Sequence, residues 1–376
     1  MTKRLKIAIF TMGRFHLCEL AKQFDRFGHD VAFYSIVPPW RTKKFGLPDH
    51  CNRWLLPQVL HWLAVNRLLG CTRFKHWIGE KQMEAFDRSM SWAMEPCDVF
   101  IGFSGICNRS GPTAKRKYGA KVWIERPSTH IESQRDILAT IASCRQVPEY
   151  HVKRELIDYC HADFVNVPSR HCYETFLERG FPTARLRRNT FGVDLDRFPA
   201  TPIPESKPTV IMTGNWCLRK GCDVLSEAMR HVDGARLIHV GPVDDCPLPK
   251  DDWFTHHDSV DEVQLKNFYA QSHVLALASR EEGLAFVQPQ ALSCGLRLVC
   301  TDRTGGADLA EFLPDPSVIR VVPHGDVQAF ASALKASLAD CRTDVGLRDR
   351  LGNSGREALT WSAYARRYER QIFESR

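Results

Sequence analysis

Short apolar runs alternate with amphipathic segments along this chain, and this alternation constrains the fold more than any other feature. Amphipathic periodicity appears between the runs, for example in FHLCELAKQF and YETFLERG. Strands that are buried on both faces appear as continuous apolar runs, and their alternation with helices is typical of parallel sheets. The sequence therefore predicts an α/β fold. In the first half the expected strands are KIAIF, VAFYS, DVFIGF, KVWIE and DFVNVPS.

The same alternation returns after a segment rich in proline. Residues 199–208, PATPIPESKP, contain four prolines and favour a linker over a helix or strand. At 376 residues the chain exceeds what one core usually supports. We therefore predict two doubly wound domains, residues 1–198 and 209–360, with ligands at the carboxyl ends of the strands. In the second domain the expected strands are TVIMTG, ARLIHVG, HVLALAS, RLVCT and VIRVVP, and the expected helices are KGCDVLSEAMRHV, VDEVQLKNFYAQ and DVQAFASALKASLAD.

Composition narrows the class of protein. Hydrophobic residues make up 44% and charged residues 25% of the chain, as in ordinary soluble proteins. The 14 cysteines are scattered without a C-x-x-C motif, so we expect a reducing cytoplasm. The net charge of +7 comes from dispersed basic residues, so nucleic acid is not the expected partner. Anionic small molecules or a membrane surface fit this charge better.

The turn after the first expected strand reads TMGRF, which is not the dinucleotide fingerprint G-x-G-x-x-G. This argues against a dehydrogenase. Gly13 would still permit a ligand to approach the backbone before a helix. A plain tight turn is the other interpretation, and the sequence leaves both open.

A cationic turn follows the first strand of the second domain. Arg219 and Lys220 lie between TVIMTG and the next helix, and Gly221 closes the turn. Two cations with free backbone N–H groups would suit a diphosphate. Taken without context, the sequence of this turn fits a solvated basic loop better.

An acidic turn follows the apolar run HVLALAS. Glu281 and Glu282 precede Gly283, and Pro289 requires the next helix to begin late. Carboxylates at a helix start commonly serve as caps or partners of the helix dipole. A carboxylate can also accept hydrogen bonds from two neighbouring sugar hydroxyls.

Together these turns resemble the retaining glycosyltransferases of family 4, which have the GT-B fold of two Rossmann-like domains facing across a cleft. The closing WSAYARRYERQI, within residues 361–376, is similar to the family's terminal helix, which crosses back to the first domain. The resemblance covers roughly residues 160 to 310 and runs in order through VPSRHCYETFLERG, NTFGVDLDRF, GNWCLRKGCDVLSEAM, RLIHVG, NFYAQSHVLALASREEGLAFVQPQALSCG and TDRTGGADL.

The resemblance implies roles for individual residues. Glu282 matches the first glutamate of the family's Glu-x7-Glu signature and is expected near the sugar hydroxyls, and Lys220 matches the phosphate-binding lysine. Gln290 stands where the ribose-binding glutamate is usual, and Asn215 stands where an arginine is usual. We infer that Arg219 supplies the missing charge. The expected donor-binding residues are Gly13, Gly214, Asn215, Gly241, Gly283, Leu284, Ala285 and Gln290.

The acceptor side is less clearly matched. VWIERPSTHIESQ resembles a variant among bacterial polysaccharide-building members, but the usual acceptor-side histidine is replaced near Glu125 and Arg126. Glu125 and the nearby His130 are therefore the candidates for the catalytic acceptor side.

We expect no metal or other cofactor, because the chain offers no H-E-x-x-H, no D-x-D and no metal-type spacing of cysteine and histidine. The adjacent pair His256 and His257 cannot readily share one metal on a strand. The nucleotide sugar itself is the expected substrate.

The resemblance implies a cytoplasmic retaining glycosyltransferase that moves a sugar from a nucleotide diphosphate donor to a glycan or lipid-linked glycan acceptor. Two alternatives stay open: a non-catalytic nucleotide-sugar-binding subunit, prompted by Asn215 and Gln290, and a nucleotide-sugar epimerase. Residues 38–78 mix tryptophan, leucine and cations. This stretch is either core packing with a solvated face or an interfacial surface for peripheral association with a membrane.

Overall fold

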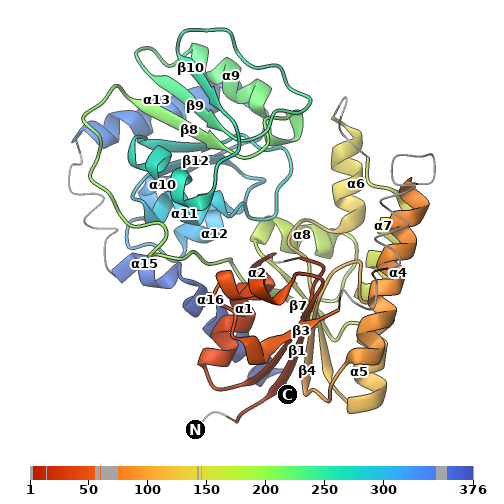
Figure 1. Cartoon of the computed structure of the whole chain (residues 1–376). Helices are drawn as coiled ribbons and strands as arrows, with labels where there is room; N and C mark the ends of the chain where they lie inside the picture. Colours follow the sequence, from red (N-terminus) through yellow and green to blue (C-terminus); the bar gives the residue numbers. More distant parts are fainter. Residues whose placement is uncertain are drawn as a thin grey trace.

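The computed structural model describes residues 3–13, 15–55, 60, 75–141, 144, 146–343 and 354–375. They form two α/β domains, each built on one parallel sheet, and the expected fold class is confirmed (Figure 1). None of the described helices combines the length and apolar character that a bilayer crossing requires.

The first domain carries a seven-stranded sheet in the order β3-β2-β1-β4-β5-β6-β7, and every neighbouring pair is parallel. Its strands are β1 (Lys6–Phe10), β2 (Asp30–Ser35), β3 (Asn52–Trp54), β4 (Val99–Phe103), β5 (Lys121–Glu125), β6 (Phe164–Val167) and β7 (Leu186–Arg188). Its helices are α1 (Phe15–Arg26), α2 (Pro39–Lys44), α4 (Lys75–Ala93), α5 (Ser110–Tyr118), α6 (Ile131–Ala139), α7 (Glu149–His161) and α8 (Arg170–Glu178), with 3-10 turns η1 (Asp49–Cys51) and η3 (Thr183–Arg185).

The second domain carries a six-stranded parallel sheet in the order β10-β9-β8-β11-β12-β13. Its strands are β8 (Thr209–Thr213), β9 (Arg236–Val240), β10 (Phe254–His257), β11 (Val274–Leu277), β12 (Arg297–Thr301) and β13 (Ile319–Val322). Its helices are α9 (Cys222–Arg230), α10 (Glu262–Ala270), α11 (Val287–Ser293), α12 (Gly306–Ala310), α13 (Val327–Thr343) and α15 (Ser354–Ala358), with 3-10 turns η4 (Leu218–Lys220) and η5 (Pro316–Val318).

All ten expected strands are present, whereas β3, β7 and β10 were not expected. They are short strands at the outer edges of the two sheets, with the sequences NRW, LRR and FTHH. An edge strand contacts the core with few side chains, so it needs no apolar run. Periodicity therefore does not reveal such strands.

Alternate side chains of the strands reach opposite faces of each sheet, as the period of two requires. In β8, Val210 and Met212 pack in a core with α9 and α13. Ile211 points into another apolar cluster, which also contains residues of α1, α11 and α16. This second cluster continues from one domain to the other.

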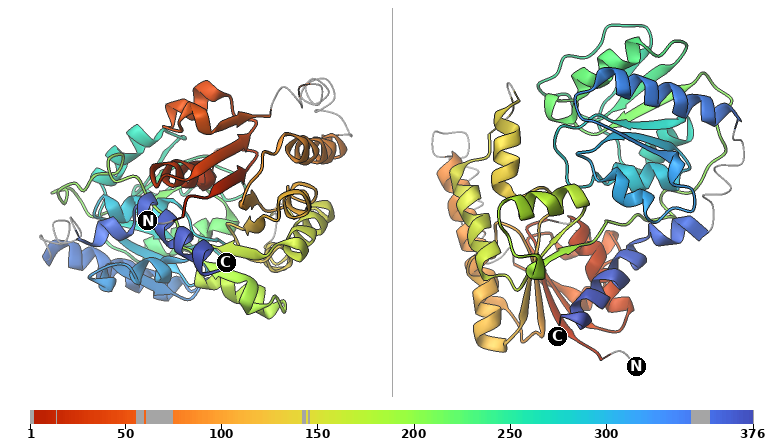
Figure 2. Two further views of the ribbon diagram at one scale, coloured as in Figure 1. Left: turned by 90° about the horizontal axis from the view of Figure 1, so that it is seen from below. Right: turned by 180° about the vertical axis from the view of Figure 1, so that it is seen from behind.

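Helix α16 (Trp361–Glu374) lies against the first domain, although it follows the second domain in the chain (Figure 2). Its Tyr364 and Tyr368 are fully buried. Glu369 Oε1 lies 2.9 Å from His29 Nε2, and Gln371 Nε2 donates to the carbonyl of Arg188 at 2.9 Å. The two domains are thus joined by the crossover after β7 and by α16.

The strand order places the carboxyl ends of certain strands at the interface. In each sheet the order reverses at the strand that comes first in the chain: β1 lies between β2 and β4, and β8 lies between β9 and β11. Ligands of doubly wound sheets bind at such switch points. The turns after β1, β8 and β11 are therefore the first place to look for a site.

Candidate functional site

The turns after β8 and β11 lie side by side because these strands are neighbours in the sheet. Gly221 closes the first turn with a φ of 67°, in the left-handed region where glycine is favoured. A Cβ at this position would meet the carbonyl oxygen of Ala278 at 2.0 Å. The close approach brings the cationic turn against the acidic one.

Lys220 and Glu282 form an ion pair across these two turns. Both side chains are largely buried, with relative exposures of 12% and 16%. Burial, followed by the nearby Arg219, lowers the pKa of the Lys220 ammonium to about 8. The two residues with the most specific expected roles therefore contact each other directly.

Glu281 is a residue whose importance the sequence did not reveal. Its side chain is fully buried and accepts hydrogen bonds from Ser128 and from Thr129 Oγ1 at 3.2 Å. Gln134 Nε2 donates at 3.2 Å, and Arg219 Nη1 lies 3.1 Å from the other carboxylate oxygen. One carboxylate of the second domain is thus held by three side chains of the first domain.

The pKa of Glu281 reflects opposing effects. Burial raises the pKa, but Arg219 and the hydrogen bonds from Ser128 and Gln134 outweigh burial and lower it. The carboxylate is therefore charged at neutral pH. The acidic pair divides its roles: Glu281 bridges the domains, whereas Glu282 faces Lys220.

Gly283 follows the acidic pair at the tightest point between the domains. A Cβ on Gly283 would lie 1.8 Å from the carbonyl oxygen of Pro127 and 2.9 Å from the Cα of Ser128. No side chain fits there without separating the two chains. The glycine therefore permits the backbones of the two domains to touch.

A pocket of about 260 Å³ opens between the domains, and of the expected site residues only Gln290 is among those that line it. Gln290 of α11 and Phe286 line it from the second domain, and His16 lines it from α1. Gln290 Oε1 accepts from the buried hydroxyl of Tyr269 at 3.5 Å. The other lining residues are Glu19, Gly192, Val193, Asp194, Arg197, Phe198, Glu262 and Trp361.

His16 is a second residue that the sequence reading did not select. Its Nε2 lies 2.8 Å from Glu125 Oε2. Because a carboxylate accepts, Nε2–H donates, and in the matching tautomer Nδ1 is an acceptor. In the described part of the chain, this buried Nδ1 has no hydrogen-bond partner. The sequence did contain one signal for this role, a histidine in the first turn of the helix that follows Gly13.

Glu125 is held in place by several polar groups. Asn166 Nδ2 donates to its Oε1 at 2.8 Å, and the hydroxyl of Tyr364 lies 3.4 Å from Oε2. The residue is 1% exposed. Glu125 therefore sets the orientation of His16 from behind and does not itself face the pocket.

Comparison with solved structures identifies the fold of the chain. The chain superposes on sucrose-phosphate synthase from Thermosynechococcus elongatus with a TM-score of 0.69 and 19% identity, covering 99% of this chain and 100% of that one. The glycosyltransferase WaaG, involved in lipopolysaccharide biosynthesis, gives 0.62 and 13% identity, covering 97% and 99%. This is the GT-B fold.

Comparison of sequences finds matches over part of the chain. Residues 207–340 match the family described as glycosyl transferases group 1. A D-inositol 3-phosphate glycosyltransferase from Xylanimonas cellulosilytica is 29% identical over 195 residues, 44% of this chain and 45% of that protein. A GDP-mannose-dependent phosphatidylinositol monomannoside mannosyltransferase from Mycolicibacterium smegmatis is 29% identical over 212 residues, 48% and 54%. The matched regions span about half the length of these relatives.

His130 does not line the pocket of the GT-B cleft. Its Nδ1 accepts from the backbone N–H of Glu132 at 3.3 Å, so it caps α6. Its ring is buried against Tyr159 and Phe176. Burial, Arg126 and Arg179 lower its pKa to about 4, so the ring is neutral at physiological pH. These contacts make it a structural residue, and His16 takes its place as the pocket histidine.

Arg126 is also engaged within the first GT-B domain. Its guanidinium lies 2.6 Å from Glu155 Oε1, and its Nε donates to the carbonyl of Thr129 at 2.9 Å. The arginine thereby shapes the loop that holds Glu281. It supports the interdomain contact from the first domain.

Two glycines shape the expected phosphate turn. A Cβ on Gly241 would meet the carbonyl of Gly214 at 2.1 Å, so the turns after β8 and β9 are in contact. That carbonyl accepts from His239 Nε2–H at 2.9 Å, and His239 Nδ1 then accepts from His256 at 2.9 Å. Asn215 Nδ2 donates to Asp244 at 3.2 Å. Asn215 thus carries no charge into the turn.

The remaining expected donor residues are placed as follows. Gly13 is half-buried in the loop between β1 and α1. Leu284 and Ala285 are 3% and 9% exposed. They lie between Gly283 and α11, where backbone groups and not side chains would be offered to a ligand.

Among the described residues, one cluster brings three potential metal ligands together. Asp25, His50 and Cys51 have ligand atoms within 4.8 Å of one another, and His50 Nε2 lies 2.7 Å from Asp25 Oδ1. The cluster belongs to α1 and η1 and includes none of the expected site residues. His256 meets His239, whereas the ring of His257 packs on Phe268.

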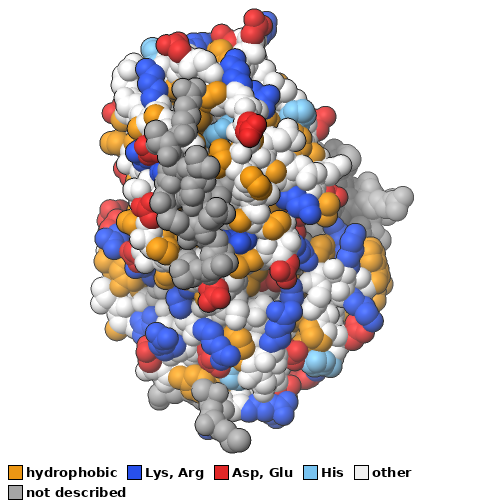
Figure 3. Space-filling model, turned by 90° about the vertical axis from the view of Figure 1, so that its left-hand side faces the viewer, with side chains coloured by type: hydrophobic (Ala, Val, Ile, Leu, Met, Phe, Trp, Pro, Cys, Tyr) orange, Lys and Arg blue, Asp and Glu red, His pale blue; other side chains and the backbone are white. Residues whose placement is uncertain are grey.

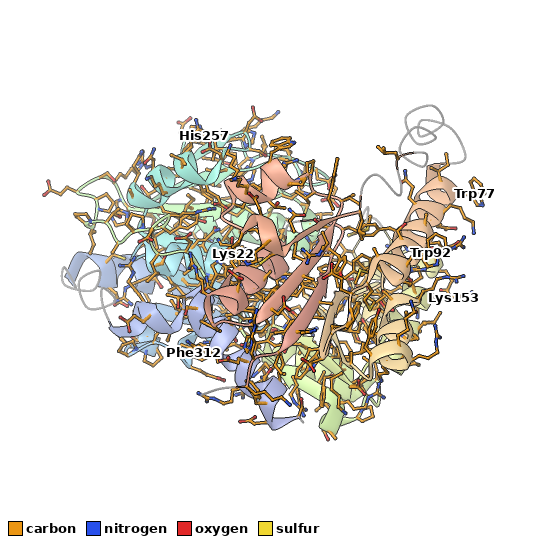
Figure 4. The ribbon with its side chains drawn as sticks, turned by 60° about the horizontal axis from the view of Figure 1, so that its bottom comes forward. Lys22, Trp77, Trp92, Lys153, His257 and Phe312 are labelled. Carbon is orange, nitrogen blue, oxygen red and sulfur yellow. The ribbon has the colours of Figure 1, made fainter. Side chains whose placement is uncertain are left out.

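The expected interfacial stretch, residues 38–78, is only partly described. Residues 56–59 and 61–74 lie outside the described residues. In the flanking parts, Trp40 and Trp77 are 71% and 51% exposed. Figure 4 shows Trp77 on the outer side of α4.

Proposed function

We propose that this protein is a retaining glycosyltransferase that moves a sugar from a nucleotide diphosphate sugar to a glycan or lipid-linked acceptor. The observation that carries the proposal is the pairing of Lys220 with Glu282 at the switch point of the second domain, and Gln290 of the helix that follows the same acidic turn lines the interdomain pocket. The match of residues 207–340 to glycosyl transferases group 1 supports the same activity.

Lys220 has the chemistry to stabilise the leaving diphosphate. Breaking the bond between the sugar and the diphosphate develops negative charge, and a preorganised cation in a buried site stabilises that charge more than the ground state. Glu282 neutralises the ammonium in the absence of donor. A diphosphate would take over this contact, and Glu282 would then be free to accept from sugar hydroxyls.

Arg219 has a different role in this proposal from the one inferred from the sequence. Its guanidinium is committed to the buried Glu281, which also binds the first domain. Arg219 therefore links the cationic turn to the interdomain contact. Its charge still raises the local potential at the diphosphate position.

The acceptor side of the proposal rests on His16 and Glu125. With Nε2–H donated to Glu125, His16 Nδ1 can accept from an acceptor hydroxyl other than the attacking one, and so position the acceptor. The attacking oxygen forms a bond to the anomeric carbon on the face from which the diphosphate leaves, so the configuration is retained. The proton of the attacking hydroxyl passes to the departing diphosphate oxygen.

The proposed acceptor and location are supported by charge and by the names of relatives. The M. smegmatis relative is named for a phosphatidylinositol mannoside acceptor, and WaaG for lipopolysaccharide biosynthesis. These names and the net charge of +7 support a lipid-linked acceptor and peripheral attachment to the cytoplasmic face of a membrane.

The test is to incubate the purified protein with UDP, GDP and ADP sugars in chelator, with and without a lipid-linked glycan fraction. The proposal expects transfer or slow donor hydrolysis with one donor class, without added metal. Donor binding without turnover under all conditions would favour a non-catalytic binding subunit. Interconversion of donor sugars without acceptor would favour an epimerase. Strict dependence on one metal would contradict the proposed role of Lys220.

A further inference from the structure

We propose that the groove between α4 and α5 is a phosphate-binding surface that docks the first domain on an anionic membrane. The inference rests on the membrane attachment in the proposed function and names the residues that would mediate it. The groove has a volume of about 480 Å³ and lies outside the interdomain pocket. Its lining residues are Arg88, Ser91, Trp92, Asn108, Arg109, Pro112, Thr113, Arg116 and Lys117.

The groove is lined by four cations and by no carboxylate. Arg88, Arg109, Arg116 and Lys117 are all exposed. Across the described residues, no acidic side chain forms an ion pair with any of these four. By contrast, Lys115 on the same helix lies 2.9 Å from Asp163. The groove therefore concentrates positive charge that the protein itself does not neutralise.

The nearest carboxylate of α4 does not compensate this charge. Asp87 is 1% exposed and accepts from the backbone N–H groups of Arg109 and Ser110 at 2.8 and 2.9 Å. Its Oδ2 also lies 3.4 Å from Arg154. Asp87 is thus turned into the domain, where it fixes the start of α5 and leaves the groove cationic.

Tryptophans on α4 favour a membrane over a soluble polyanion. Trp92 is 76% exposed and follows Arg88 by four residues, so the two side chains share one face of the helix. Trp77 lies about four turns before Trp92 on a similar face. Figure 4 shows Trp77 on the outer side of α4 and Trp92 farther along the same helix. Exposed indoles beside cations are typical of surfaces at the headgroup level.

The opposite side of the molecule has a different character. Figure 3 shows that basic and acidic side chains are interspersed there. Anionic headgroups would therefore orient the protein with α4 and α5 toward the bilayer. Each basic residue near such a surface strengthens binding about fivefold.

The test measures co-sedimentation of the full chain with vesicles of phosphatidylcholine, either alone or with about 30% phosphatidylglycerol. The second composition gives the vesicles a substantial negative surface potential. We expect binding only to the anionic vesicles, weakened by salt. The double variant Arg88→Gln and Arg116→Gln should lose roughly 25-fold in vesicle affinity. Trp92→Ser should weaken vesicle binding without changing the salt dependence.

The matched control is Lys250→Gln with Lys335→Gln, two exposed cations of the second domain. It removes the same charge and should bind vesicles as the wild type does. Equal losses in both double variants would overturn the proposed surface, as would binding that is independent of phosphatidylglycerol or of Trp92. Binding of single-stranded DNA as tightly as vesicles, insensitive to Trp92→Ser, would also overturn it. Titration of each variant with nucleotide sugar shows whether the donor site is intact. It therefore distinguishes failure of the membrane proposal from failure of the glycosyltransferase proposal.

Discussion

Lys220 and Glu282 are 62 positions apart in the chain, yet their side chains form an ion pair where the turns after β8 and β11 meet. Each charge therefore controls how accessible the other is to a ligand. An anionic donor competes with Glu282 for the ammonium group. This competition is the basis of the first two predictions.

The two members of this pair should fail differently when replaced by alanine. Glu282→Ala should lose sugar-dependent affinity and transfer, yet bind the bare nucleoside diphosphate at least as tightly as wild type, because Lys220 loses its competing carboxylate. Lys220→Ala should weaken the diphosphate and lower turnover by about 100-fold. Calorimetric titration with nucleoside diphosphate and nucleotide sugar checks both, with Lys250→Ala as an exposed control. Identical binding by all four proteins would remove the proposed site.

Diphosphate affinity should fall as pH rises through about 8. The pKa of Lys220 is about 8 in the free protein, so the ammonium is present below this pH and is lost above it. Binding of an anion favours the charged form, so complex formation near pH 8 should take up a proton. Titration between pH 7 and about 9.5 measures the trend. Lys220→Arg keeps its charge over this range, and a fall of equal size in that variant would contradict the assignment.

Glu281→Ala should destabilise the whole chain by about 3–5 kcal/mol, because it leaves Arg219 and the donors of the first domain without their buried partner. The lowered pKa of Glu281 means that its contribution is present above the ordinary pKa of 4.5 and is lost as pH falls through the lower folded value. The difference from wild type should therefore shrink in acid. Thermal unfolding measures it, with the exposed Glu178→Ala as a control within about 0.5 kcal/mol of wild type.

Gly283→Ala should separate the two domains at their tightest contact. The new Cβ would lie 1.8 Å from the Pro127 carbonyl, and relief of such overpacking typically costs about 1–3 kcal/mol. We expect a lower melting temperature and a larger radius of gyration by small-angle scattering. Gly79→Ala in α4 has open space around its Cβ and should leave the radius unchanged. An unchanged radius for Gly283→Ala would contradict this account.

Substitutions of His16 and of His130 should have different effects on transfer activity and on stability. His16→Gln should lower transfer without a comparable loss of stability, because it removes the imidazole of a residue that lines the pocket. His130→Ala should lower stability by about 1 kcal/mol or more through loss of the α6 cap and of ring packing. Transfer per folded molecule should be unaffected by His130→Ala. Initial rates normalised to folded protein, measured beside melting curves, decide between them.

Much of the fold follows from local patterns in the chain. The run TVIMT is apolar on both faces, so it can satisfy its backbone and bury its side chains only inside a parallel sheet, and it forms β8. Gly221 and Pro289 mark where the following helices begin for reasons of backbone conformation. Such features depend on interactions between residues close in sequence, so periodicity and turn residues reveal them. The three-residue edge strands β3 and β7 show no such pattern.

The roles of the acidic pair were decided by tertiary structure. REEG predicts a turn with two carboxylates, and nothing in those four letters distinguishes Glu281 from Glu282. The fold turns Glu281 toward Ser128 and Thr129 of the other domain and Glu282 toward Lys220. In the same way, the sequence pointed to His130 and not to His16, but packing places His16 at the pocket and buries His130 as a helix cap. Burial and partner choice depend on residues that are distant in the chain, which a local pattern cannot contain.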